Sequence, residues 1–229
     1  MKTAIVTPIG YESKSDNYFE WSRKEMLPFV PANCRRVLDV GCGTGGFGAS
    51  LKQTREIEVW GVEPVSSAAE KASAKLDNVV CGPFDSQINL PVGNFDCVIF
   101  NDVLEHMVAP ERSLRYAKSL LSPGGSIVAS IPNIQYLPIV WRLLFHAQWE
   151  YTDAGVLDKT HLRFFTKSTI VTMFQSEGYS LQSICGINAY GCDPMPDRIL
   201  RNSYKLINEL FFGRFGDMKF PQFAVVAKV

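Results

Sequence analysis

The residues with the most specific chemical meaning lie in one short stretch, VLDVGCGTGGFG, which runs from Val37 to Gly48. Four glycines occur within six residues there, and Asp39 precedes the first of them by two positions. Glycine allows tight turns and lets a ligand approach the backbone closely. A glycine-rich turn directly after an apolar run therefore predicts a loop that holds part of a nucleotide-like ligand.

Two cofactor classes fit this spacing. The pattern G-x-G-x-x-G, typical of nicotinamide dinucleotide sites, is met by Gly41, Gly43 and Gly46. The pattern D-x-G-x-G-x-G is met by Asp39, Gly41, Gly43 and Gly45. A carboxylate at Asp39 does not help to bind a pyrophosphate, whereas it suits the sulfonium and ammonium of S-adenosylmethionine. We expect S-adenosylmethionine, with a nicotinamide cofactor as the alternative.

Two further acidic residues follow the next apolar runs. Glu63 ends the second run, 24 residues after Asp39, where a carboxylate can accept hydrogen bonds from both ribose hydroxyls. Asp85, in GPFDS, could accept a hydrogen bond from an adenine amino group, with Phe84 beside the ring. The alternatives are a solvated strand end for Glu63 and a helix cap for Asp85.

Composition narrows the class of protein. Lys plus Arg and Asp plus Glu number 23 each, so bulk charge gives no indication of a nucleic-acid partner. The six cysteines lack zinc-like spacing and indicate reduced thiols. The N-terminus has no long apolar region, and three prolines interrupt the longest uncharged run, 122–141. We therefore expect a cytoplasmic protein with no membrane span.

The order of elements predicts an α/β fold with a parallel sheet, because short apolar runs alternate with amphipathic stretches. We expect strands at 35–40, 58–63, 78–82, 95–101 and 125–132, and helices at 45–53, 65–76 and 109–121. Next come a helix at 166–179 with Thr166 as N-cap and Gly178 as its stop, a strand at 180–188, a helix at 198–212 and a closing strand at 222–229.

These elements predict one domain over residues 1–229. It has an N-terminal helical extension over 1–34 and two cover insertions over 133–165 and 189–219. The first insertion is aromatic and irregular, and it is too long for a simple connection, so we expect it to cover a site.

Five blocks of the sequence resemble class I S-adenosylmethionine-dependent methyltransferases. They are VLDVGCGTGGFG, VWGVEP, FDCVIFNDVLEHM, LLSPGGSIVASIPN and LDKTHLRFFTKSTI, in that order. The resemblance is closest to the bacterial branch associated with glycosyltransferases and surface-polysaccharide synthesis. It implies a Rossmann-like, seven-stranded, mostly parallel sheet with an antiparallel last strand and helices on both faces.

The same resemblance implies contacts with each part of the cofactor. The residues expected at the methionine part are Gly41, Cys42, Gly43 and Gly46, and Cys42 there is only a small residue. Glu63, with Pro64 after it, would contact the ribose, and Phe84 and Asp85 the adenine. Asn101, Asp102 and Val103 would line the reactive end. Tyr18 and Arg23 would close over the methionine carboxylate, the alternative being a helix packed on the sheet edge.

Histidine is the usual side chain for removing a hydroxyl proton near neutral pH, and the chain has three. We predict that His161, in the cover segment, is the base, with His106 as second choice; a structural hydrogen bond is the alternative for both. His146 is expected to be a packed or surface residue. Asp158 would orient His161 or bind a sugar hydroxyl.

Other residues point to the acceptor. Arg163 offers a fork suited to a phosphate or carboxylate, or a salt bridge that holds the cover segment. The aromatic residues of the cover segment suit a sugar-stacking wall or a lipid-facing lid, with a small satellite core as the alternative; they are Tyr136, Trp141, Phe145, Trp149 and Tyr151. Asp102, Glu105 and His106 form a D-x-x-E-H pattern that resembles the metal-binding E-x-x-E-H of ubiquinone-biosynthesis O-methyltransferases, but we expect no metal.

These patterns together predict a methyltransferase that acts on an oxygen of a saccharide or sugar-linked intermediate. The alternatives are an O-methyltransferase for a small phenolic or quinone-like acceptor, an NAD-dependent oxidoreductase, and a non-catalytic cofactor-binding partner of a glycosyltransferase. The expected partners are a small-molecule or saccharide acceptor and no nucleic acid, and the sequence is compatible with a homodimer.

Overall fold

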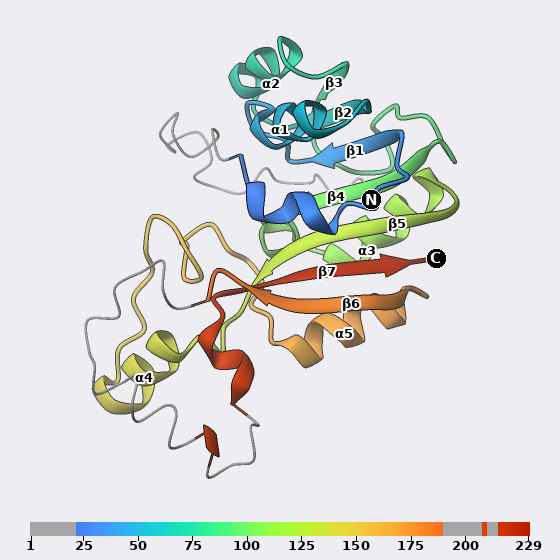
Figure 1. Cartoon of the computed structure of the whole chain (residues 1–229). Helices are drawn as coiled ribbons and strands as arrows, with labels where there is room; N and C mark the ends of the chain where they lie inside the picture. The colour runs from blue at the N-terminus through green and yellow to red at the C-terminus, as the bar shows by residue number, and fades with distance from the viewer. Residues whose placement is uncertain (1–21, 190–207, 210–214) are drawn as a thin grey trace, which may run out of the picture.

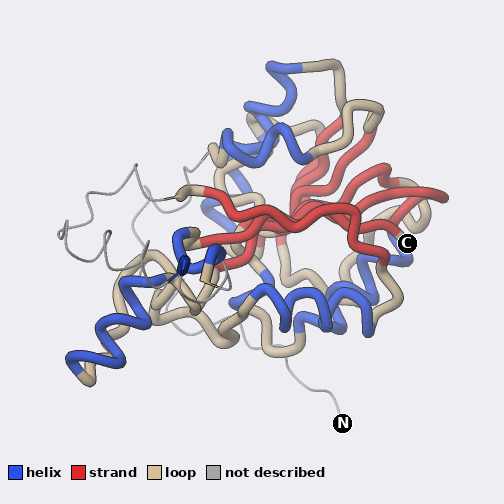
Figure 2. The backbone as a smooth tube through the Cα atoms, turned by 60° about the horizontal axis from the view of Figure 1, so that its bottom comes forward, coloured by secondary structure: helices blue, strands red, loops and turns tan. Residues whose placement is uncertain are grey.

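A seven-stranded sheet runs through the middle of the molecule, with helices on both of its faces (Figures 1 and 2). The structure is a computed structural model that describes residues 22–189, 208–209 and 215–229. The strands are β1 (Arg36–Val40), β2 (Glu58–Glu63), β3 (Asn78–Cys81), β4 (Phe95–Asn101), β5 (Leu121–Pro132), β6 (Ser180–Ile187) and β7 (Gln222–Lys228). Their order is β3-β2-β1-β4-β5-β7-β6, and β7 alone runs antiparallel to its neighbours. The predicted fold class is confirmed.

Each face of the sheet has its own core. On β1, Leu38 and Val40 join one buried cluster and Val37 joins the other, as the alternation of a strand requires. The helices α3 (Pro110–Leu120) and α5 (Lys167–Ser176) pack on the first face. The second face is covered by η3 (Lys24–Phe29), α1 (Gly46–Thr54) and α2 (Ser66–Ser73). Burial on both faces explains why these strands are nearly continuous apolar runs in the sequence.

The chain changes direction across the sheet between β1 and β4. From β1 it proceeds to β2 and β3 on one side, and β4 and β5 then fill the other side. Parallel strands leave their carboxyl ends at one edge, and ligands of such sheets bind where the strand order reverses. The glycine turn after β1 and the polar residues after β4 therefore meet at the point where this fold binds ligands.

The start of α5 follows the sequence expectation closely. The Thr166 hydroxyl accepts a hydrogen bond from the Thr169 amide at 3.3 Å, and the Thr169 hydroxyl accepts one from the Thr166 amide at 2.9 Å. This reciprocal capping box satisfies two amides that have no partner inside the helix. Gly178, with φ of +77°, follows the end of the helix as predicted.

The segment 133–165 is less irregular than predicted, because it contains α4 (Leu137–His146). Pro138 lies in the first turn of this helix, where its missing amide hydrogen has no intrahelical acceptor to lose. The helix projects from the body of the protein (Figure 1), and Leu137 is its one buried residue. No helix within the described ranges is long and apolar enough to cross a membrane.

Two predicted features fall outside the described residues. Tyr18 is one, and the other is nearly all of the helix expected over 198–212, of which only residues 208–209 are described. The remaining described elements are short: η4 (Leu104–His106) follows β4, and η5 (Gly216–Lys219) precedes β7.

The capping box gives a direct stability prediction. Thr166→Ala should lower the free energy of unfolding by about 1 kcal/mol, because it leaves the Thr169 amide without its acceptor. Urea unfolding measures the change. Thr172→Ala, in the same helix but away from its start, is the control and should change stability by less than about 0.5 kcal/mol. Equal effects of the two substitutions would contradict the capping role.

Candidate active site

The turn after β1 needs glycine at several positions. Gly41, Gly43 and Gly45 have φ of +68°, +54° and +77°, a region that disfavours other residues. A Cβ on Gly41 would also lie 2.7 Å from a methyl carbon of Val103, so the turn and the end of β4 are in contact. Gly46 is instead the first residue of α1. The conformation thus follows the D-x-G-x-G-x-G spacing.

Two carboxylates are buried beside this turn. Asp39 is 2% exposed and Glu63 is 3% exposed. Glu63 accepts hydrogen bonds from the amides of Gly43 at 2.9 Å and Val65 at 3.0 Å. Pro64, which follows Glu63, is half-buried. Among the described residues, Oδ2 of Asp39 has no hydrogen-bond partner. Burying an unsatisfied acceptor is costly, so a ligand that brings a hydrogen-bond donor or a cation to Asp39 would be stabilised there.

The pKa values of the two carboxyl groups at the turn reflect the cost of burying their charged forms. Burial, with a contribution from the charge of Glu63, raises the pKa of Asp39 to about 8. Burial also raises the pKa of Glu63, although hydrogen bonds from Val65 and Gly43 oppose this. A positively charged ligand group near Asp39 would restore the ionised form.

Cys42 occupies the turn as a buried thiol. Burial raises its pKa far above the ordinary value, and the charges of Asp39 and Glu63 add to the effect. A nucleophilic cysteine needs the opposite shift. A Cβ on Gly61 would lie 2.6 Å from the sulfur of Cys42, which shows how closely this side chain is packed. These features favour the predicted role as a small packing residue.

The residues predicted to contact adenine are held by local contacts. The ring of Phe84 packs on Phe100 and Tyr116, with centroids 5.6 and 5.1 Å apart. Asp85 accepts a hydrogen bond from the amide of Gln87 at 2.7 Å, which forms a turn and not the predicted alternative of a helix cap, because no helix begins there. Their contact with adenine stays a prediction.

Asp102 lies at the end of β4 and connects three parts of the chain. Its carboxylate accepts hydrogen bonds from the Ser130 hydroxyl at 2.9 Å and the Gln222 amide at 3.0 Å, and it forms an ion pair with Arg23. Arg23 is thereby fixed at the carboxyl edge, although its predicted contact with the methionine carboxylate stays untested. The adjacent Asn101 has a side-chain amide whose nitrogen and oxygen are buried without partners among the described residues.

The structure brings the two predicted histidines together. The rings of His106 and His161 meet edge to face with centroids 4.6 Å apart. Nδ1 of His161 lies 3.0 Å from the carbonyl oxygen of Val156, and Nδ1 of His106 lies 3.1 Å from that of Thr160. Carbonyl oxygens only accept hydrogen bonds, so both Nδ1 atoms carry hydrogen and both neutral rings keep their lone pair on Nε2.

Glu105 was named in the sequence only as part of the D-x-x-E-H pattern, and its proximity to His161 was not predicted. Its carbonyl oxygen accepts hydrogen bonds from the amides of Leu162 and Arg163, which ties the cover segment to η4. Its side chain lies beside His161, with Oε1 3.9 Å from Nε2. Glu105, His106 and His161 present ligand atoms within 4.8 Å of one another, whereas Asp102 is paired with Arg23. The D-x-x-E-H pattern therefore does not form a site by itself.

The predicted acceptor residues have mixed surroundings. Asp158 accepts hydrogen bonds from the amide and hydroxyl of Thr160, while Val156 orients His161. Arg163 donates to the carbonyl oxygen of Val108 at 2.5 Å rather than forming a salt bridge. Trp149 is 37% exposed and packs edge-on against Phe164.

Two other predicted residues lie at the ends of α4. Tyr136 is the half-buried N-cap of α4, and His146 is exposed at its last position, as predicted.

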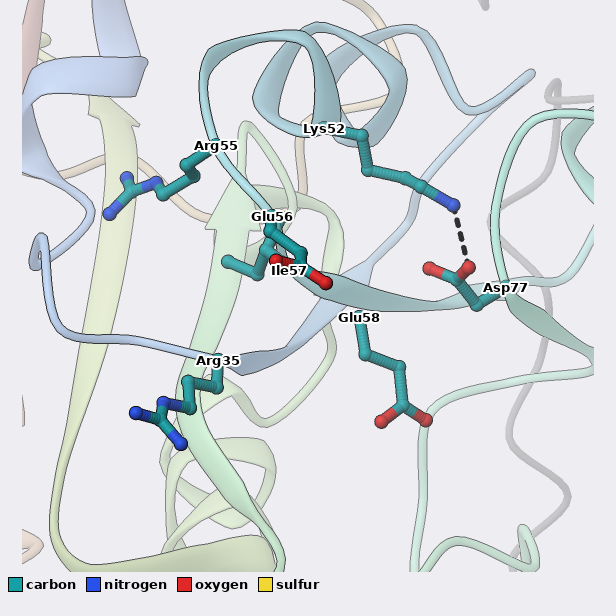
Figure 3. A pocket seen from close by; sticks show the side chains of 7 residues that line it. All are labelled: Arg35, Lys52, Arg55, Glu56, Ile57, Glu58 and Asp77. Atoms are coloured by element: carbon teal, nitrogen blue, oxygen red, sulfur yellow. Dashed lines mark hydrogen bonds and ion pairs between the residues drawn. The ribbon is translucent and has the colours of Figure 1, made fainter.

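A separate hollow of about 850 Å³ lies at the amino ends of β1 and β2, opposite the glycine turn; Figure 3 shows the side chains that line it. It is lined by Arg35, Lys52, Arg55, Glu56, Ile57, Glu58 and Asp77. Lys52 and Asp77 form an ion pair of 2.6 Å across it. Because ligands of parallel sheets bind at the carboxyl ends of the strands, this hollow is not the cofactor site.

Comparisons with known proteins agree with this geometry. A family model described as a methyltransferase domain matches residues 14–184. The human mitochondrial ubiquinone biosynthesis O-methyltransferase is 26% identical over 173 residues, covering 70% of this chain and 45% of that protein. The Chromobacterium violaceum ubiquinone biosynthesis O-methyltransferase is 28% identical over 192 residues, covering 80% and 79%. The chain spans about half the length of the first curated relatives it matches.

Solved structures share the fold. A SAM-dependent methyltransferase from Archaeoglobus fulgidus superposes with a TM-score of 0.67 at 22% identity, covering 95% of this chain and 96% of that one. These comparisons support the predicted class I methyltransferase resemblance. They do not support the glycosyltransferase-associated branch.

The buried Asp39 leads to a prediction about stability. Its pKa is higher in the folded protein than in the unfolded chain, so unfolding releases a proton and stability falls as pH rises from about 4 to about 8. Asp39→Asn should remove this loss and raise the free energy of unfolding by about 1–3 kcal/mol at pH 7.5, with little change near pH 4.

Denaturant unfolding across that pH range tests the prediction. Asp77→Asn is the control, because the pKa of Asp77 is lowered by hydrogen bonds from Lys52 and Val59 that outweigh its burial. That substitution should reduce stability at neutral pH. An Asp39→Asn protein less stable than wild type at every pH would show that the carboxylate is well compensated.

Proposed function

The chain belongs to the methyltransferase domain family and its cofactor is S-adenosylmethionine, and on that premise we propose that it methylates a hydroxyl oxygen of a small acceptor. The observation that carries the proposal is the pair of buried histidines beside the carboxyl edge of the sheet, in which Nδ1 of His161 donates to Val156 and Nε2 is the basic nitrogen of the neutral ring. An oxygen acceptor needs such a base, because its hydroxyl proton must be removed.

The residues at the switch point fit this cofactor. Asp39 is a buried carboxylate whose unmet charge suits an ammonium group. Glu63 offers oxygens that accept from ribose hydroxyls, and the glycine turn permits close backbone approach. The unpartnered amide of Asn101 offers a donor and an acceptor at the end of β4.

The reaction itself is a displacement at carbon. When bound, the cofactor supplies a methyl group on a sulfonium, so that the acceptor oxygen forms the new carbon–oxygen bond as the carbon–sulfur electron pair returns to sulfur. His161 takes the hydroxyl proton at Nε2, since Val156 holds Nδ1 as a donor. The cover segment, tied to η4 through the backbone of Glu105, aligns the acceptor. Alignment of reacting groups is worth up to ~7–11 kcal/mol in favourable cases.

The class of acceptor rests on two different observations. The relatives named ubiquinone biosynthesis O-methyltransferases favour the small phenolic or quinone-like acceptor. The saccharide acceptor predicted from the sequence is supported only by the exposed aromatic side chains of the cover segment, such as Trp149 and Tyr151. We therefore place the phenolic acceptor first. Transfer of isotopically labelled methyl groups to parallel panels of phenols and sugars decides between them.

The first functional prediction concerns the cofactor. Glu63→Ala should weaken binding of S-adenosylhomocysteine by ~1.5–3 kcal/mol, the scale of hydrogen bonds to a charged group. Isothermal titration calorimetry measures the change. Glu58→Ala, at the other end of the same strand, pairs with Arg36 and should leave the affinity unchanged. Normal affinity in a folded Glu63→Ala protein would remove this residue from the site.

The second functional prediction concerns the base. His161→Ala should lower kcat by about 10²–10⁴-fold and leave S-adenosylhomocysteine affinity nearly unchanged. His146→Ala, at the exposed end of α4, is the control and should keep normal turnover. Thermal unfolding must show that the His161→Ala protein keeps its fold. Near-normal turnover in that folded protein would pass the role to His106 or to no residue.

A further inference from the structure

The side chain of Glu105 is buried without the partners that a carboxylate normally has. The residue is 0% exposed, and neither carboxylate oxygen has a hydrogen-bond partner among the described residues. Leaving such a group unpaired costs several kcal/mol, so buried carboxylates are nearly always matched by a donor or a cation. The contacts between η4 and the cover segment do not explain an acid here, because Glu105 takes part in them through its backbone carbonyl oxygen and not through its carboxylate.

The neighbouring ring shows what the carboxylate faces. Nε2 of His161 lies 3.9 Å from Oε1 of Glu105, and this nitrogen is the proton acceptor of the neutral ring because Nδ1 is committed to Val156. Two acceptors at this distance repel until a proton arrives. Once His161 is protonated at Nε2, the same two atoms become an ion pair within a buried setting.

The other charged groups around this pair are mostly negative. Burial raises the pKa of Glu105 well above its ordinary value; Asp102 and, to a smaller extent, Asp158 add to this, while Arg23 opposes it. Arg23 is itself paired with Asp102, and the ring of His106 lies against that of His161. Among the described residues, the imidazoles of His161 and His106 both lie within 4.8 Å of Glu105, and the 3.9 Å approach of Nε2 to Oε1 favours His161 as the cation that faces it.

We propose that Glu105 is the positioning residue of this site: its buried carboxylate stabilises the imidazolium that forms when His161 takes the proton of the acceptor hydroxyl. This inference rests on the proposed function and extends it, since it adds the group that lets a buried histidine hold a positive charge. The proton moves from the acceptor oxygen to Nε2; the positive charge on His161 in turn favours the ionised form of Glu105, which acts through His161 alone.

Glu105→Gln separates this role from a structural one. The substitution preserves shape and removes a charge that is costly to bury, so thermal stability should stay equal or rise. The pH at which the His161 imidazole titrates, read by NMR on isotopically labelled full-length protein, should fall by about one unit. The acidic limb of the kcat–pH profile should move in the same direction, and its plateau should fall about 10- to 100-fold. Glu105→Asp should restore part of the titration shift.

Glu177→Gln is the matched control, because Glu177 is also largely buried and pairs with Arg115 far from the site; it should alter neither titration nor turnover. An unchanged His161 titration in Glu105→Gln would overturn the proposal. So would turnover that is lost in EDTA and restored by Mg²⁺ or Zn²⁺, because Glu105 would then be a metal ligand. A shifted titration without turnover on any hydroxyl acceptor would support the pairing and contradict the proposed function.

Discussion

Buried carboxyl groups at one edge of the sheet are the constraint on which the rest of this structure depends. Asp39, Glu63 and Glu105 are each almost fully buried, and oxygens of Asp39 and Glu105 lack partners among the described residues. A protein that only needed to fold would replace such groups, because apolar residues of similar size are often more stable. Their presence makes sense if cations arrive there during function, an ammonium at Asp39 and an imidazolium beside Glu105.

The topology of the fold brings these carboxyl groups to the same edge of the sheet. The reversal of strand order at β1 and β4 places the glycine turn against Val103, at the edge where we propose that cofactor and acceptor bind. Asp102 then joins the N-terminal segment, β5 and β7 through Arg23, Ser130 and Gln222. A single carboxylate thus connects three distant parts of the chain around the end of β4.

The sequence predicted the parts of the protein that depend on local pattern. Buried parallel strands are continuous apolar runs, and the glycines of the turn have positive φ that few other residues adopt, so both were recognisable. The prediction that 133–165 is irregular was wrong over α4, because this helix buries only Leu137 and so lacks the buried apolar face by which a helix is recognised in a sequence. The pairing of Glu105 with His161 joins residues 56 positions apart through an irregular segment, and no periodicity reports such a contact. The contact of Gln222 with Asp102 spans 120 residues and was equally hidden.

The account's central claim, that the buried carboxylate of Asp39 receives the positive charge of the cofactor, can be tested by counting protons. Titration calorimetry of S-adenosylhomocysteine binding at pH 7, repeated in phosphate and in Tris buffer, reports the protons released. Because burial raises the pKa of Asp39 to about 8, wild-type protein should release nearly one proton on binding, and Asp39→Asn should release none. Equal binding enthalpies in the two buffers for wild type, or the same proton release in Asp39→Asn, would contradict the account.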